Sequence, residues 1–158
     1  MRTQSLDRDN LFMGLAIELA RAAYDNDEVP VGAVIVQTRN NEVISAFSNQ
    51  MRKQRSSIAH AEMLAIQKAN KIIDNERLIG CEMFVSLEPC PMCAHAISIS
   101  RLDTLYFAAE DSKGGGVING PKIFESSSCH HKPEVKYGLM ADESSKLLRS
   151  FFKSKRLK

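Results

Sequence analysis

The sequence predicts an α/β fold in three layers, a five-stranded mixed sheet with helices on both faces. Short runs rich in β-branched residues alternate with longer segments of helical periodicity. In the second half, helices separate the strands, which favours parallel crossovers that cover both faces of the sheet. A length of 158 residues suits one domain with a substantial core, and no linker or internal repeat interrupts it. We therefore expect a single domain over residues 1–158.

The first half of the chain predicts a helix followed by a hairpin. Residues 11–24 place apolar side chains at helical spacing, and residues 31–36 form a short apolar run typical of a buried strand. Residues 43–47 predict a second strand. Because Asn40-Asn41 is a favoured turn between these two strands, we expect them to pair as a hairpin.

After the hairpin, a basic loop over residues 51–57 leads into a helix over 61–69. The remaining elements are expected in this order: a strand over 83–87, a helix from 91 to about 100, a strand over 104–108, a flexible glycine turn over 113–116, a short element over 121–124, a strand over 134–137, and a C-terminal helix over about 141–156.

Two short motifs indicate a metal site. His60-Ala61-Glu62 begins one helix, and Pro89-Cys90-Pro91-Met92-Cys93 follows a strand and begins another. Cys90 and Cys93 lie one helical turn apart, so both sulfurs can face one metal ion. Pro91 suits the first helical position, and a helix N-terminus favours the thiolate form of cysteine. The two thiolates and the imidazole of His60 make three zinc ligands.

The count of ligands distinguishes a catalytic from a structural zinc. A structural site fills all four tetrahedral positions with protein, whereas a catalytic site leaves one for water. Glu62 adds an unliganded carboxylate that can exchange protons with this water, whose pKa zinc lowers toward about 7. The pattern therefore predicts hydrolytic chemistry with one zinc ion per subunit.

Two other interpretations of these motifs stay open. A Cys-x-x-Cys pair can be a redox centre, although that function usually requires a thioredoxin-like context. A structural zinc would need a fourth ligand, for which Cys81, Cys129, His95, His130 and His131 are available, although Cys81 is better explained as a small core residue. Glu62 favours the catalytic interpretation, because a structural site needs no base.

Composition narrows the class of protein further. Residues 1–10 are polar and do not resemble a signal peptide, and no apolar run approaches the roughly 18 residues of a membrane helix. Four cysteines, two of them in a metal motif, do not suggest a disulfide framework. We expect a soluble protein located in the cytoplasm, with no membrane association.

Positive charge gathers at the C-terminus. From Lys146 onward there are six basic residues and no acidic one, and the rest of the chain carries 15 basic against 19 acidic residues. Such a block either solubilises a helix end or binds phosphates, and charge alone favours neither. Phe151 and Phe152 lie inside it, and aromatic faces beside basic residues are typical of single-strand binding, although both could be ordinary core contacts.

The chain resembles the bacterial tRNA-specific adenosine deaminases of the TadA family, within the cytidine deaminase-like superfamily. The resemblance covers about residues 11–156. It depends on the zinc motifs and on the segments 28–34, 86–90, 111–113, 141–143 and 151–153. The zinc motifs alone specify the superfamily, and the last three segments narrow the resemblance to the tRNA enzymes.

The resemblance implies a cytidine deaminase-like fold, a homodimer, and conversion of adenosine to inosine at the wobble position of a tRNA anticodon, in an arginine tRNA. It implies that zinc-bound water attacks C6 of adenine while Glu62 transfers protons. It also implies the site residues: zinc ligands His60, Cys90 and Cys93, proton shuttle Glu62, base contact Asn49, loop contacts Asp111 and Lys113, and anticodon-loop contacts Phe151, Phe152 and Lys153. Without the resemblance, Asn49 is better explained as a residue that caps a turn.

Two departures from the family pattern concern RNA contacts. Glu110 stands where a basic residue is frequent, and the 126–131 loop is short, with His130 where asparagine is common. Two other functions therefore remain under consideration. One is a free nucleobase deaminase acting on guanine or cytosine, and the other is a non-catalytic RNA-binding module with a structural zinc.

Overall fold

The computed structural model describes residues 2–157. Each expected strand and helix is present, with ends shifted by a few residues except at the first helix. In chain order the elements are α1 (Arg2–Asp25), β1 (Gly32–Gln37), β2 (Glu42–Ser48), α2 (Ala61–Ile73), β3 (Cys81–Leu87), α3 (Pro91–Ile99), β4 (Thr104–Ala109), a short 3-10 helix (Ile123–Glu125), β5 (Glu134–Tyr137) and α4 (Ala141–Arg156).

The sheet is mixed, as the sequence predicted. Its strand order is β2-β1-β3-β4-β5. β1 runs antiparallel to both β2 and β3, whereas β3, β4 and β5 are mutually parallel. Because β3 and β4 are parallel neighbours, the loops that follow them lie at the same edge of the sheet. That edge is where the metal motif follows β3.

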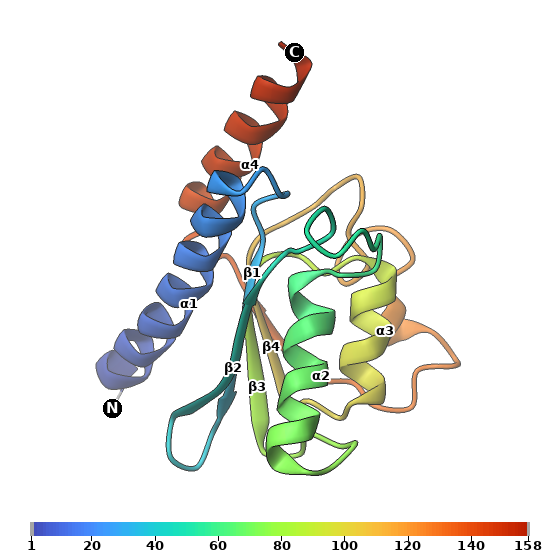
Figure 1. Cartoon of the computed structure of the whole chain (residues 1–158). Coiled ribbons are helices and arrows are strands. Elements are labelled where there is room, and N and C mark those ends of the chain that lie inside the picture. Colours follow the sequence, from blue (N-terminus) through green and yellow to red (C-terminus); the bar gives the residue numbers. More distant parts are fainter. Residues whose placement is uncertain (1, 158) are drawn as a thin grey trace.

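Helices cover both faces of this sheet and complete the three-layer fold. α1 and α4 lie side by side on one face, and α2 and α3 cover the other (Figure 1). Alternate side chains of β1 point to opposite faces of the sheet. Val34 and Val36 pack in the core under α1, whereas Ala33 and Ile35 pack in the core under α2. Within residues 2–157, no helix has both the length and the apolar character required to cross a bilayer.

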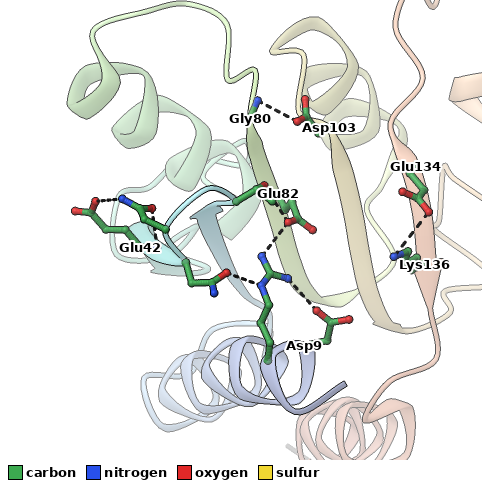
Figure 2. Close-up of polar contacts among 11 residues, drawn as sticks. Asp9, Glu42, Gly80, Glu82, Asp103, Glu134 and Lys136 are labelled. Carbon is green, nitrogen blue, oxygen red and sulfur yellow. Dashed lines mark hydrogen bonds and ion pairs between the residues drawn. The ribbon is translucent and has the colours of Figure 1, made fainter. Parts of the chain in front are cut away.

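The N-terminal helix is longer than the sequence predicted, because α1 begins at Arg2 and not near residue 11. Its polar first turns are held by a charge network rather than by an apolar face. Arg8 donates hydrogen bonds to Glu82 of β3 and to Asp9, and both donor–acceptor distances are 2.9 Å. Thr38 donates a further hydrogen bond to the same Glu82 carboxylate (Figure 2). The Arg8 guanidinium also lies 5.3 Å from the ring centroid of Phe12.

Candidate active site

Three ligand atoms meet where α2 and α3 begin. His60 is the N-cap of α2 and Cys90 the N-cap of α3, while Cys93 lies in the first turn of α3 behind Pro91. The loops after β2 and β3 bring both helix starts to the same end of the sheet (Figure 1). The ligand atoms of His60, Cys90 and Cys93 lie within 4.8 Å of one another.

The geometry of this group fits zinc. His60 Nδ1 lies 3.7 Å from the Cys90 sulfur and 3.5 Å from the Cys93 sulfur. Zinc bonds of about 2.0 Å to nitrogen and 2.3 Å to sulfur at tetrahedral angles would place such atoms about 3.6 Å apart. Within residues 2–157, no further His, Cys, Asp or Glu joins the group. The protein therefore offers three ligands and leaves one tetrahedral position open.

The two thiols differ in their tendency to ionise, and a cation between them would favour the ionised form of both. Hydrogen bonds from Cys93 and His60 lower the pKa of Cys90 to about 4. The neighbouring Cys90 sulfur and burial raise the pKa of Cys93, because they disfavour a second thiolate. A divalent cation between the sulfurs would stabilise both as thiolates, since metal binding releases such protons.

The other alternative ligands have different environments. Cys81 is fully buried in the core at the start of β3, as the sequence predicted, and burial raises its pKa. His95 is exposed on α3. Cys129 lies 3.1 Å from the Ser98 hydroxyl, and His131 Nε2 lies 2.6 Å from the carbonyl oxygen of Leu102.

Glu62 is buried beside the metal group without belonging to it. Its side chain lies in the first turn of α2, and the residue is 4% exposed. Burial raises the pKa of Glu62 to about 7, because a charged carboxylate loses its hydration there. A carboxyl group with this pKa can both accept and release a proton near neutrality.

A pocket of about 480 Å³ opens beside Glu62 and has the size of a small-ligand site. Seven residues that the sequence predicted for the site line it: Asn49, His60, Glu62, Cys90, Asp111, Lys113 and Phe152. Cys93 lies just behind it in α3, fully buried. The pocket thus brings the metal group and the base-contact candidates together.

One wall of the pocket comes from α4, through residues that sequence reasoning missed. Ser145, Leu148 and Arg149 line the pocket together with Phe152. Their spacing of three and four residues places them on one helical face, so helical periodicity anchored on Phe152 could have identified them. Arg149 adds an exposed cation to the pocket mouth.

The Asn49 amide has a defined orientation. Its Oδ1 accepts a 2.8 Å hydrogen bond from the backbone N–H of Ala61, the first residue of α2. The residue is 5% exposed and lines the pocket, and its Nδ2 has no hydrogen-bond acceptor within residues 2–157. The amide can therefore offer an N–H donor to a ligand. The capping contact and the ligand contact considered from the sequence are compatible.

Glu88 organises the loop on the opposite wall and was not identified from the sequence as a site residue. Its buried carboxylate accepts backbone N–H groups of four residues and the Nδ2 of Asn119, which lowers the pKa of Glu88 against the opposing effect of burial. The four N–H donors belong to Asp111, Val117, Ile118 and Asn119. The loop from 111 to 119 is therefore fastened to the start of α3.

This arrangement corrects the expected flexible turn over 113–116. Gly115 and Gly116 are buried, and a Cβ at Gly115 would lie 2.4 Å from the Glu88 carboxylate. A Cβ at Gly116 would lie 2.6 Å from the nitrogen of Pro91. These glycines permit close packing of the loop on the metal motif, which is a different reason for glycine than flexibility.

The two phenylalanines of α4 have different environments. Phe151 is 6% exposed and packs edge-on against Tyr24, with ring centroids 5.7 Å apart. Phe152 is 46% exposed and lines the pocket. Lys153 is exposed nearby but does not line the pocket. Phe151 therefore contributes to the core in this structure, whereas the ring of Phe152 is accessible to a ligand.

The fold and the three-ligand centre define a class of zinc-binding deaminases. Residues 6–109 match the family model described as the cytidine and deoxycytidylate deaminase zinc-binding region, which identifies zinc as the metal of this centre. Individual relatives show which family within this class the chain belongs to.

The tRNA-specific adenosine deaminase of Agrobacterium fabrum is 46% identical to this chain, over 92% of this chain and 95% of its own length. The tRNA-specific adenosine deaminase of Bacillus subtilis is 39% identical, over 97% of this chain and 94% of its own length. The chain therefore belongs to the tRNA-specific adenosine deaminase family, which confirms the resemblance.

Solved structures agree with this assignment. A chain from a study of A-to-I editing by tRNA:A34 deaminases at the wobble position of transfer RNA has a TM-score of 0.84 and 44% identity, over 87% of this chain and 98% of that one. The guanine deaminase from Nitrosomonas europaea has a TM-score of 0.77 and 28% identity, over 90% and 83%. The predicted cytidine deaminase-like fold is confirmed.

Proposed function

We propose that this chain is a zinc-dependent tRNA adenosine deaminase that converts adenosine to inosine at the wobble position of an anticodon. The observation that supports it best is one pocket that joins a three-ligand metal group, a buried carboxyl group and an exposed aromatic ring on a cationic helix. The tRNA-specific relatives and the neighbouring tRNA:A34 deaminase structure favour the same reaction.

The metal would be held by His60, Cys90 and Cys93, with one zinc per subunit of a single deaminase domain over 1–158. When bound, zinc supplies a water molecule acidic enough to act as a nucleophile at neutral pH. The remaining chemistry belongs to the protein. Glu62 protonates the ring nitrogen next to C6 of adenine and later delivers a proton to the departing amino group. One water is consumed and one ammonia is released for each inosine formed.

The pocket would hold the base through polar and aromatic contacts. The Nδ2 of Asn49 donates to an acceptor nitrogen of adenine, because its Oδ1 is occupied by the Ala61 N–H. The base must leave its stack to enter the pocket, which costs a few kcal/mol and least for a loop nucleotide. An anticodon loop provides such a nucleotide.

The RNA around the base would contact the pocket rim. Asp111 and Lys113 border the nucleotide from the loop that Glu88 fastens, while Phe152 and Lys153 contact the anticodon loop from α4. By resemblance to the family, the substrate is an arginine tRNA, and the enzyme is a homodimer located in the cytoplasm.

Guanine deamination is the second candidate function, because guanine deaminase structures share this fold. The decisive experiment incubates the zinc-loaded protein separately with an anticodon stem-loop that contains A34 and with free guanine. We expect inosine at position 34 by RNA sequencing and no release of ammonia from guanine. Turnover of guanine without inosine in the stem-loop would replace the proposed function by its alternative.

A further inference from the structure

The basic loop over residues 50–56 has no role in the chemistry described above. Arg52, Lys53 and Arg55 give it three cations and no acidic side chain. All three are exposed, and neither Lys53 nor Arg55 forms an ion pair within residues 2–157. Two unpaired cations beside a functional pocket suggest an anionic ligand.

The backbone of this loop is held in place, so its cations are presented from a fixed base. The carboxylate of Glu28, 4% exposed, accepts backbone N–H groups of Arg52 and Lys53 at 2.9 Å each. The Ser56 N–H donates to the Met51 carbonyl at 2.9 Å. A loop ordered in this way loses little conformational freedom when it binds a ligand.

The loop lies at the mouth of the catalytic pocket, next to the cationic end of α4. Met51 lines the pocket from the loop, as Phe152 does from α4. Asp27 accepts hydrogen bonds from both Arg52 of the loop and Lys155 of α4. The loop before α2 and the far end of α4 therefore lie at the same end of the sheet (Figure 1).

A second hollow, of about 550 Å³, adjoins this loop. It shares Asn49 with the catalytic pocket, so the two hollows are neighbours. Seven of its eleven lining residues are polar, among them the cations Arg52 and Lys53 and the acidic Glu28. The Glu28 carboxylate is already occupied by backbone N–H groups of the loop. A hollow of this size and polarity suits a sugar and its phosphate rather than an apolar ligand.

We propose that the 50–56 loop forms a second wall of the RNA-binding cleft. The strand next to the target nucleotide crosses the polar hollow, and Lys53 and Arg55 neutralise its phosphates. An everted nucleotide has phosphates on both sides, and the 50–56 loop adds cations at the pocket mouth to those of Lys113 and of the α4 end. This inference rests on the proposed function and specifies how its RNA is held.

The test compares two double variants of equal charge. Lys53→Gln/Arg55→Gln removes the two loop cations, and Lys68→Gln/Arg77→Gln removes one lysine and one arginine that are exposed on α2 and in the turn after it, away from His60. Affinity of each zinc-loaded protein for a fluorescent anticodon stem-loop is measured by anisotropy from about 50 to 200 mM salt. Zinc content and melting temperature verify that both variants fold.

For the loop variant we expect the slope of log affinity against log salt to flatten by about 1.4, or about 0.7 for each lost phosphate contact. If the variant and the wild type bind equally at 1 M salt, this difference in slope makes the affinity of the variant roughly tenfold lower at about 0.15 M salt. Deamination at low RNA concentration should fall in parallel and recover at saturation. The α2 variant should match the wild type in all three measurements.

Unchanged slope and affinity in the loop variant would overturn the inference, and so would equal losses in both variants, which would indicate only long-range attraction. In either case the wild type still deaminates the stem-loop, so the proposed function survives. A wild type that neither binds nor edits the stem-loop would overturn the proposed function, and the inference with it.

Discussion

At the scale of single residues, Glu62 differs from the neighbouring metal ligands because its carboxylate neither coordinates the metal nor forms, within residues 2–157, an ion pair that would stabilise its charge. It lies outside the ligand group of His60, Cys90 and Cys93, and it is buried at a cost that its hydrogen bonds do not remove. Burial of a carboxyl group without a compensating ion pair is unfavourable for folding and typical of a group retained for proton transfer.

Replacing Glu62 with glutamine should therefore separate chemistry from metal binding. We expect Glu62→Gln to keep one zinc per chain and its melting temperature, while deamination of the stem-loop falls at least about 10²-fold, because general acid–base catalysis is lost. Zinc is measured by atomic absorption and inosine by sequencing. Glu76→Gln, the same change at an exposed position after α2, should behave like the wild type. Loss of zinc from Glu62→Gln would instead make Glu62 a ligand.

The metal motif is the part of the site that local geometry predicts, whereas Asn49, Asp111, Lys113 and Phe152 were predicted from the resemblance to the family. Cys90 and Cys93 lie one helical turn apart in any helix that begins at Pro91, so their common orientation follows from spacing. Glu88 and Arg149 were missed for the opposite reason. The role of Glu88 depends on a loop more than twenty residues away, and that of Arg149 on where α4 docks. Neither dependence is local.

At the scale of elements, α4 gives two different environments to its adjacent phenylalanines, whose rings meet edge-on with centroids 5.4 Å apart. Phe151 is buried against Tyr24 and Phe152 faces the pocket. Phe151→Ala should lower the free energy of unfolding by about 3 kcal/mol, because it leaves a cavity. Phe152→Ala should leave stability nearly unchanged and weaken stem-loop binding by about 1–3 kcal/mol. Thermal melts and anisotropy measure the two effects. The reverse assignment would show that the exposed ring is not the RNA contact.

α1 shows why its first turns escaped prediction from periodicity. Residues 2–10 have few apolar side chains, and their helix is fastened through Arg8 to the Glu82 carboxylate, whose side chain is 7% exposed. Glu82 lies more than seventy residues away, so no local pattern indicates the contact. A polar helix start can thus be stabilised by one distant, nearly buried partner.

The same pair gives a prediction for stability. Arg8→Met should lower the free energy of unfolding by about 3 kcal/mol, because it leaves the Glu82 carboxylate buried without its cation. Arg8→Met/Glu82→Met should recover most of this loss, since two apolar side chains replace the pair. Urea unfolding of the four members of this double-mutant cycle measures the coupling. Purely additive effects would contradict an energetic role for the pair.

At the scale of the whole molecule, layer order followed from the alternation of strands and helices, while the strand order did not. The hairpin partner of β1 was predictable, because only the four-residue turn over 38–41, which contains Asn40-Asn41, joins the strands. The position of β3 on the other side of β1 was not, since it depends on packing of α2 across the sheet. The long connection from β4 to β5, residues 110–133, contains only the short 3-10 helix, so it gave little periodicity from which to predict a parallel pair.

The metal group lies where β3, α2 and α3 meet, so zinc should stabilise the molecule and not only its site. A ligand that binds the folded state at a thousand times its Kd adds about 4 kcal/mol, which for a chain of this size corresponds to roughly 10 °C in Tm. We expect Cys90→Ala to lose zinc, activity and about this much thermal stability. A chelator should lower the Tm of the wild type toward that of Cys90→Ala and leave the variant unchanged. Cys129→Ala, at a cysteine outside the group, should keep its zinc and its response to the chelator. Tight zinc retained by Cys90→Ala, with near-normal turnover, would show that Cys90 is not a ligand.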